Sequence, residues 1–302
     1  MTERNLRRSV VFVTALAFGM GAPLLARAST DSGGETESRS LEYDKSVGLP
    51  LFAGAIAAVA LPAAVYKTPP ACRWCDGARI DAIDRWARKA KWEEPCRAAR
   101  LSYASLGAAG AVALLPMSRE PDGDDWLTNA GAVADSVAVT VMLTQVVKYT
   151  VRRARPEADT CHPGRSKEQD RNLSFFSGHT AIAFALVSSA HETARLRGRP
   201  TSDWVWVGGA AAAATAYLRM AGGRHYLIDV FTGAGVGYVV GRWIPQHVTH
   251  PNGPRSMGPG QAFRSSPSPP LFAYSRPVGS DGNVILQLGK GPGRSVQVGL
   301  RF

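Results

Sequence analysis

The stretch Phe176-Ser177-Gly178-His179-Thr180 leads directly into the apolar run 181–187. A short polar segment before an apolar run marks the start of a helix. The first turn of a helix carries unbonded N–H groups and the positive end of the helix dipole, and Gly178 lets the backbone approach a ligand closely. Alone, Ser-Gly-His is an ordinary turn. Placed here, it predicts a helix whose first turn can bind an anion.

Two other clusters are rich in basic residues, and one of them also contains a histidine and an aspartate. The first reads Lys148-Tyr-Thr-Val-Arg-Arg-Ala-Arg155-Pro156, and the second reads Arg219-Met-Ala-Gly-Gly-Arg224-His225-Tyr-Leu-Ile-Asp229. Lys148, Arg155 and Arg219 can hold the oxygens of a phosphoryl group, the arginines with bidentate geometry. Fixed cations and N–H groups aimed at these oxygens are the main source of catalysis in phosphoryl transfer. The clusters therefore predict a phosphate site.

The histidines supply a nucleophile and a proton donor. His225 and Asp229 are four residues apart and share a helix face if the chain is helical from residue 227. A carboxylate bonded to one ring nitrogen fixes the tautomer and leaves the other nitrogen free to attack phosphorus. His179, on another segment, is then available as general acid and later as general base. A His–Asp pair at this spacing is commonly a surface pair, so the prediction depends on all three clusters together.

The pattern Lys-x6-Arg-Pro, Ser-Gly-His and Arg-x5-His-x3-Asp resembles that of the type 2 phosphatidic acid phosphatase and vanadium haloperoxidase superfamily, over residues 148–229. The resemblance implies a phosphohistidine at His225, oriented by Asp229, with His179 protonating the leaving group. It also implies that the phosphate is bound by Lys148, Arg155, Ser177, Gly178 and Arg219. No metal or other cofactor is implied for phosphatase activity.

Two positions depart from the family's pattern. Phe176 replaces a proline before Ser177, and Leu218 replaces a serine before Arg219. Neither change removes a charged or proton-transferring group. The departures therefore bear on the shape of the pocket and on individual phosphate contacts rather than on the reaction.

Six apolar stretches indicate the fold: residues 49–66, 101–117, 129–147, 180–194, 204–218 and 227–244. Several are rich in Ala and Gly, which favours close helix packing. Most are near the lower length limit for crossing a bilayer, and Asp135, Glu192 and Arg195 interrupt them. We expect an all-α six-helix bundle, membrane-embedded or membrane-associated, formed by the helical phosphatase domain at residues 48–244.

The chain before and after this domain differs in composition. Residues 1–28 carry arginines, an apolar run and Ala26-Arg27-Ala28, which predicts a cleaved signal peptide, with an uncleaved anchor as the alternative. Residues 29–47 are polar and predicted to be disordered. Residues 245–302 indicate a Pro/Gly/Ser-rich linker and a tail of short strands at 271–275, 284–288 and 296–302. A small β appendix is favoured, because so few strands cannot close a membrane barrel.

Four cysteines, Cys72, Cys75, Cys96 and Cys161, bear on the compartment. In an exported protein they predict disulfides, although Cys72-x2-Cys75 also has the spacing of a zinc-ligand pair. If all six helices cross the membrane, the cysteines and the phosphate site fall on one side, which we expect to be the oxidising one. This predicts a cell-envelope protein, in the membrane with a periplasm-facing active site or, as the alternative, soluble in the periplasm.

The net charge of the chain and the position of its cations indicate which molecules it can bind. The formal net charge is +11, but no nucleic-acid motif is present and the cations gather at the phosphate site. We expect an exported, metal-independent phosphatase that acts at the membrane on a phosphorylated lipid or polyprenyl diphosphate. A soluble broad-specificity acid phosphatase is the alternative. Two weaker alternatives are a vanadate-dependent haloperoxidase and an inactive lipid-phosphate-binding protein. The sequence does not indicate which oligomeric state the protein adopts.

Overall fold

The computed structural model describes residues 40–65, 70–75, 82–114, 123–156, 170–199, 204–251, 272–278, 282–288 and 296–301. The predicted signal peptide at 1–28 and Cys161 lie outside these residues. The chain divides into two compact units, Met1–Gly253 and Pro254–Phe302, which are described one at a time.

The first unit is helical, in agreement with the predicted fold class. Its elements are β1 (Leu41–Tyr43), α2 (Lys45–Val65), α3 (Ala82–Ala87), the 3-10 turn η2 (Arg88–Ala90), α4 (Pro95–Leu114), α5 (Gly123–Val151), α7 (Gly178–Leu196), α8 (Trp204–Ala221), α9 (Leu227–Val248) and β2 (Thr249–Pro251). In the described part of the chain, six helices of 18 to 29 residues coincide with the six apolar stretches. The short α3 and η2 lie within residues 80–92, whose amphipathic pattern, with Ile83, Trp86 and Ala90 on one face, predicts a helix.

The two ends of this unit are more ordered than the sequence predicts. Residues 41–47 were expected to be disordered, and residues 245–251 were assigned to the linker. Instead β1 pairs antiparallel with β2, with Leu41 opposite Pro251 and Tyr43 opposite Thr249. This pairing ties the start of α2 to the end of α9, which continues through Pro245. A pairing between segments so far apart leaves no local signal in the sequence.

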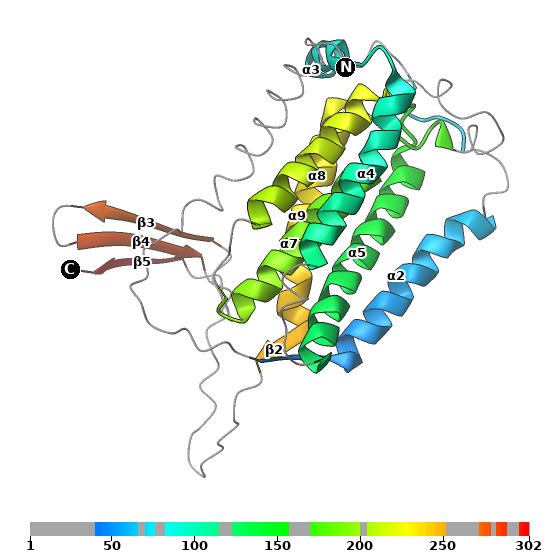
Figure 1. Cartoon of the computed structure of the whole chain (residues 1–302). Coiled ribbons are helices and arrows are strands. Elements are labelled where there is room, and N and C mark those ends of the chain that lie inside the picture. Colours follow the sequence, from blue (N-terminus) through cyan, green and yellow to red (C-terminus); the bar gives the residue numbers. More distant parts are fainter. Residues whose placement is uncertain are drawn as a thin grey trace. The chain divides into compact units, whose positions relative to one another are not determined.

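Helix α7 lies at the centre of the bundle, where it contacts α9, α5, α4 and α8 (Figure 1). α4 packs against α8, and α2 lies along α5 at the edge (Figure 1). The contact between α7 and α9 is close because α9 presents glycines to the backbone of α7. A Cβ on Gly233 would lie 2.6 Å from the Ser177 carbonyl oxygen, and one on Gly237 would overlap the Ala181 carbonyl group. Small residues thereby hold the first turn of α7 against α9.

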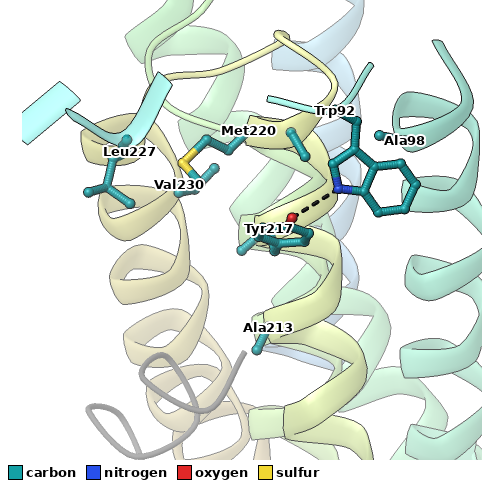
Figure 2. Packing of buried hydrophobic residues seen from close by; sticks show 10 residues of the cluster. Trp92, Ala98, Ala213, Tyr217, Met220, Leu227 and Val230 are labelled. Atoms are coloured by element: carbon teal, nitrogen blue, oxygen red, sulfur yellow. Dashed lines mark hydrogen bonds between the residues drawn. The ribbon is translucent and has the colours of Figure 1, made fainter. Parts of the chain in front are cut away.

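A buried apolar cluster fixes the segment that precedes α4. Figure 2 shows Trp92 packed beside Ala98, with Tyr217 and Met220 of α8 and Val230 of α9 completing the cluster. The Trp92 indole Nε1 donates a hydrogen bond to the Tyr217 hydroxyl at 2.9 Å. The Trp92 backbone N–H donates to the Ala221 carbonyl oxygen at 3.1 Å. Residues 82–92 are therefore anchored to the ends of α8 and α9.

By length and composition, two of the described helices can cross a membrane: residues 125–151 of α5, and α9. The apolar part of α2, residues 45–60, is shorter. These helices support an association with the membrane. The expectation that all six helices span it stays a prediction.

The second unit contains the tail strands. β3 (Phe272–Val278), β4 (Gly282–Leu288) and β5 (Val296–Arg301) form an antiparallel sheet in the order β3-β4-β5. Phe272 lies opposite Leu288, and Leu288 lies opposite Val296. This is the small β appendix that the sequence predicts.

The packing of α9 on α7 predicts the effect of an added methyl group. Gly237→Ala should lower the free energy of unfolding by about 1–3 kcal/mol, because the new Cβ overlaps the Ala181 backbone. Gly235→Ala is the matched control, since nothing lies within 4 Å of its Cβ position. It should leave stability unchanged or raise it by up to about 1 kcal/mol. Thermal unfolding of both variants measures the difference, and equal midpoints would contradict the proposed contact.

Candidate active site

The structure brings the three sequence clusters together at one end of the helical unit. α5 and α8 end there, and α7 and α9 begin there. Lys148 and Arg219 lie in the last turns of α5 and α8, whereas Gly178 begins α7 and Asp229 lies in the first turn of α9. His225 lies in the turn between α8 and α9. Residues far apart in sequence therefore face one another because four helix ends converge.

His225 is held with one ring nitrogen bonded and the other turned toward cations. Its Nδ1 lies 2.8 Å from the Ser174 carbonyl oxygen. A carbonyl can only accept, so Nδ1 carries the hydrogen and Nε2 keeps its lone pair. Nε2 lies 3.5 Å from Nη1 of Arg155 and 3.5 Å from Nη2 of Arg219. The lone pair of a potential nucleophile thus points between two guanidinium groups.

Burial sets the charge state of His225. The side chain is 1% exposed. Burial, followed by the charges of Arg155 and Arg219, holds the pKa of His225 well below its usual range. The imidazole is consequently neutral at physiological pH, which is the form that can attack phosphorus.

Asp229 does not form the expected direct hydrogen bond with the His225 ring and contacts it through Ser174 instead. Its Oδ2 lies 3.8 Å from His225 Nδ1, beyond hydrogen-bond distance. Oδ2 instead accepts hydrogen bonds from the Ser174 hydroxyl at 2.6 Å and from the Tyr226 backbone N–H at 3.0 Å. Ser174 therefore connects the two residues, because its hydroxyl bonds the carboxylate and its carbonyl bonds the imidazole.

Arg153 is a central residue that the sequence analysis missed. It is 2% exposed and forms two ion pairs, from Nη1 to Asp229 Oδ1 at 2.6 Å and from Nη2 to Asp84 Oδ2 at 2.8 Å. Its guanidinium carbon lies 4.2 Å from the centre of the Trp74 ring and 4.0 Å from that of Tyr226. Asp84 also accepts the Ile228 N–H at 3.0 Å. One buried arginine thus links α3, the segment after α5 and the start of α9.

A disulfide lies beside this arginine. Cys72 and Cys75 are joined, and Cys96 is also disulfide-bonded. The Ala154 N–H donates a hydrogen bond to the Trp74 carbonyl oxygen at 3.2 Å. The loop closed by the disulfide therefore lies next to the backbone at Arg153. Cys72 and Cys75 are therefore not a zinc pair. Among the residues described, no group of three or more His, Cys, Asp or Glu could hold a metal ion.

Two of the predicted phosphate-binding residues, Arg155 and Arg219, lie beside Nε2 of His225, and the others lie at or beside the start of α7. Arg155 is oriented by an ion pair with Asp170 and by donation from its Nη1 to the Arg224 carbonyl oxygen at 3.1 Å. Lys148 Nζ lies 3.9 Å from the position that a Cβ of Gly178 would take, so its amine borders the first turn of α7. The Ser177 hydroxyl is buried and lies 2.9 Å from the Thr180 hydroxyl. The first turn of α7 thus lies directly beside the cations.

His179 lies in the first turn of α7 and packs against α4. Its ring packs edge-on against Tyr103 of α4 at 4.7 Å between ring centres. The guanidinium carbon of Arg219 lies 5.9 Å from the same Tyr103 ring. Burial, followed by the charges of Arg219, Lys148 and Arg155, lowers the pKa of His179 to about 3. The ring is therefore neutral when no anion offsets these charges.

The buried and partly buried groups of the site leave an excess of positive charge. In the described segments, its cations are Lys148, Arg153, Arg155, Arg219 and Arg224, and its carboxylates are Asp84, Asp170 and Asp229. Since both histidines are neutral, five cations face three carboxylates and two positive charges remain. In addition, Arg219 Nε and Arg224 Nε are buried without a hydrogen-bond partner in this part of the chain. The site is thus built to receive an anion rich in acceptor atoms.

Comparisons with known proteins agree with this geometry. Residues 129–251 match the model of the PAP2 superfamily. A lipid A 1-phosphatase from Porphyromonas gingivalis is 32% identical over 118 residues, which cover 37% of this chain. The aligned part spans only 23% of that relative's length. No solved structure matches the chain.

The Arg153 ion pairs predict a large loss of stability when the cation is removed. Arg153→Gln leaves Asp84 and Asp229 buried without their cation, which should lower the free energy of unfolding by about 3–5 kcal/mol. Arg97→Gln is the control, because Arg97 is exposed and its ion pair with Glu94 lies on the surface. It should change stability by less than about 0.5 kcal/mol. Denaturant unfolding compares the two, and similar midpoints would contradict the assigned role of Arg153.

Proposed function

We propose that this protein, whose residues 129–251 belong to the PAP2 superfamily, is a metal-independent phosphatase that hydrolyses lipid-linked phosphomonoesters or diphosphates through a phosphohistidine at His225. The observation that carries the proposal is the neutral His225 ring, whose Nε2 faces Arg155 and Arg219 in a site with two uncompensated positive charges. A phosphomonoester carries nearly two negative charges at neutral pH. The substrate therefore neutralises the site that binds it.

In the first step, Nε2 of His225 attacks phosphorus. The N–P bond forms while the P–O bond to the leaving alcohol breaks, and the alcohol oxygen takes a proton from His179. Arg155, Arg219 and Lys148 bind the phosphoryl oxygens as charge develops on them. The imidazole becomes positively charged, and it is stabilised by the Ser174 carbonyl and the carboxylate of Asp229 behind it. Asp229 is thus a positioning residue that acts through Ser174.

In the second step, water replaces the alcohol. His179, now neutral, removes a proton from water as the oxygen attacks phosphorus. The P–N bond breaks, phosphate leaves, and His225 returns to its neutral form with Nδ1 still donating to Ser174. The first turn of α7 supports both steps, because it carries His179 and borders Lys148.

Three observations support a lipid substrate in the cell envelope. The relative with aligned sequence is named for a lipid phosphate, and two helices can cross a membrane by length and composition. The Cys72–Cys75 disulfide lies beside the site, and disulfides persist in oxidising compartments. We therefore propose that the site faces the periplasm and that the substrate presents its phosphate at the membrane surface.

The mechanism predicts which histidine is indispensable. His225→Ala should reduce phosphate release about a thousandfold or more, because no other nucleophile replaces Nε2. His179→Ala should retain some phosphate release from aryl phosphates, because their leaving groups need little protonation and only the second step is slowed. His247→Ala is the control, since this histidine is exposed and stacks on Trp243 away from the site. The measurement is phosphate release from purified protein with and without a chelator. Full activity in His225→Ala, or loss of activity on chelation, would contradict the mechanism.

The lowered pKa of His179 predicts that anion binding takes up a proton. An anion offsets the charges of Arg219, Lys148 and Arg155, so the pKa of His179 should rise from about 3 on binding. A group whose pKa rises on binding draws a proton from solution. Calorimetric titration with sulfate, a dianion that does not titrate near neutral pH, in buffers of different ionisation enthalpy measures this uptake. It should shrink in His179→Gln, and sulfate binding without proton uptake in the wild type would refute the prediction.

A further inference from the structure

Arg224 is a buried cation that the mechanism above does not use. Its side chain is 7% exposed, and its Nε has no hydrogen-bond partner in the part of the chain that the structure describes. Its backbone, in contrast, is fixed at both polar groups. The N–H donates to the Arg219 carbonyl oxygen at 3.0 Å, and the carbonyl accepts from Arg155 Nη1 at 3.1 Å. The residue is therefore anchored between two phosphate-binding arginines while its guanidinium donor stays unsatisfied.

Such an arrangement points to a ligand. A buried N–H without an acceptor costs folding free energy, so an acceptor from outside the described residues, such as a water molecule or a ligand, is expected to bind it. The Arg224 carbonyl oxygen accepts a hydrogen bond from Arg155 Nη1, and Arg155 Nη1 lies 3.5 Å from His225 Nε2. Burial, followed by the charge of Arg155, lowers the pKa of Arg224. Arg224 thus lies beside Arg155 at the cation-rich side of the site.

The charge balance gives Arg224 a specific consequence. With Arg224, the site has two positive charges in excess of its carboxylates, and without it only one remains. Attraction to the Arg224 guanidinium scales with the charge of the ligand, so a phosphate monoester with two ionised oxygens gains more from it than a phosphodiester or another singly charged ester. We propose that Arg224 binds the phosphoryl group directly and makes the site selective for doubly charged over singly charged esters. This proposal rests on the proposed phosphatase function and deepens it.

The test compares two ligands of fixed charge at one pH. Sulfate carries two negative charges and methyl sulfate carries one, and neither titrates near neutral pH. Calorimetric binding of both to the purified full chain measures the ratio of their affinities. Arg224→Gln should weaken sulfate binding by about 10- to 100-fold, the effect of losing one charged hydrogen bond in a buried site, and methyl sulfate binding by much less.

Two further variants separate charge selection from a structural role. Arg224→Lys restores the charge and should recover most of the preference for sulfate. Arg88→Gln removes an exposed cation at the rim of a pocket beside His225, outside the buried set, and should keep the preference. An equal loss for both ligands in Arg224→Gln, or no loss for either, would overturn the proposal. Sulfate binding by a wild-type chain that releases no phosphate from monoesters would contradict the proposed function while leaving the charge selection intact.

Discussion

The site depends on the burial of Arg153 between the carboxylates of Asp229 and Asp84. Burying a charge is costly unless it is paired and hydrogen-bonded, and here one guanidinium satisfies two acids from different parts of the chain. Asp229 then holds the Ser174 hydroxyl, and the Ser174 carbonyl fixes the tautomer of His225. The proposed nucleophile is therefore oriented by a chain of contacts that begins at an ion pair, not by a carboxylate bonded directly to its ring.

The same pairing explains how the site can concentrate positive charge. Arg153 neutralises Asp229 from behind, and Asp170, another carboxylate among the described residues of the site, is paired with Arg155. Arg155 is held in place before any substrate arrives, by Asp170 and by the Arg224 carbonyl oxygen. Burial, followed by the charges of the cations of the site, lowers the pKa of both histidines and keeps them neutral, which suits the proposed roles of nucleophile and proton donor. Pre-organised charge of this kind is the main resource of a phosphoryl-transfer site.

The sequence was sufficient for the parts of the structure that local pattern controls. The six long helices follow from their apolar runs, and the start of α7 at Gly178 follows from the polar stretch before residue 181. The contacts of Arg153 could not be predicted in the same way, because Asp84 and Trp74 are about 70 to 80 residues away in sequence. In the run Arg152-Arg153, only the fold decides which guanidinium turns inward. For the same reason the sequence predicted a bond from Asp229 to His225 where Ser174 intervenes.

The central claim is that His225 becomes phosphorylated during turnover, and direct detection of that intermediate tests it best. The enzyme is mixed with an aryl phosphate labelled at phosphorus, and the reaction is stopped rapidly. Mass spectrometry under conditions that preserve N–P bonds then locates the label on the protein. The account predicts a transient phosphoryl group on His225 that forms before phosphate is released. It also predicts that His179→Ala prolongs the lifetime of this species, because hydrolysis of the intermediate needs His179 as the base. Label on another residue, or phosphate release in a single turnover without any labelled protein, would contradict it.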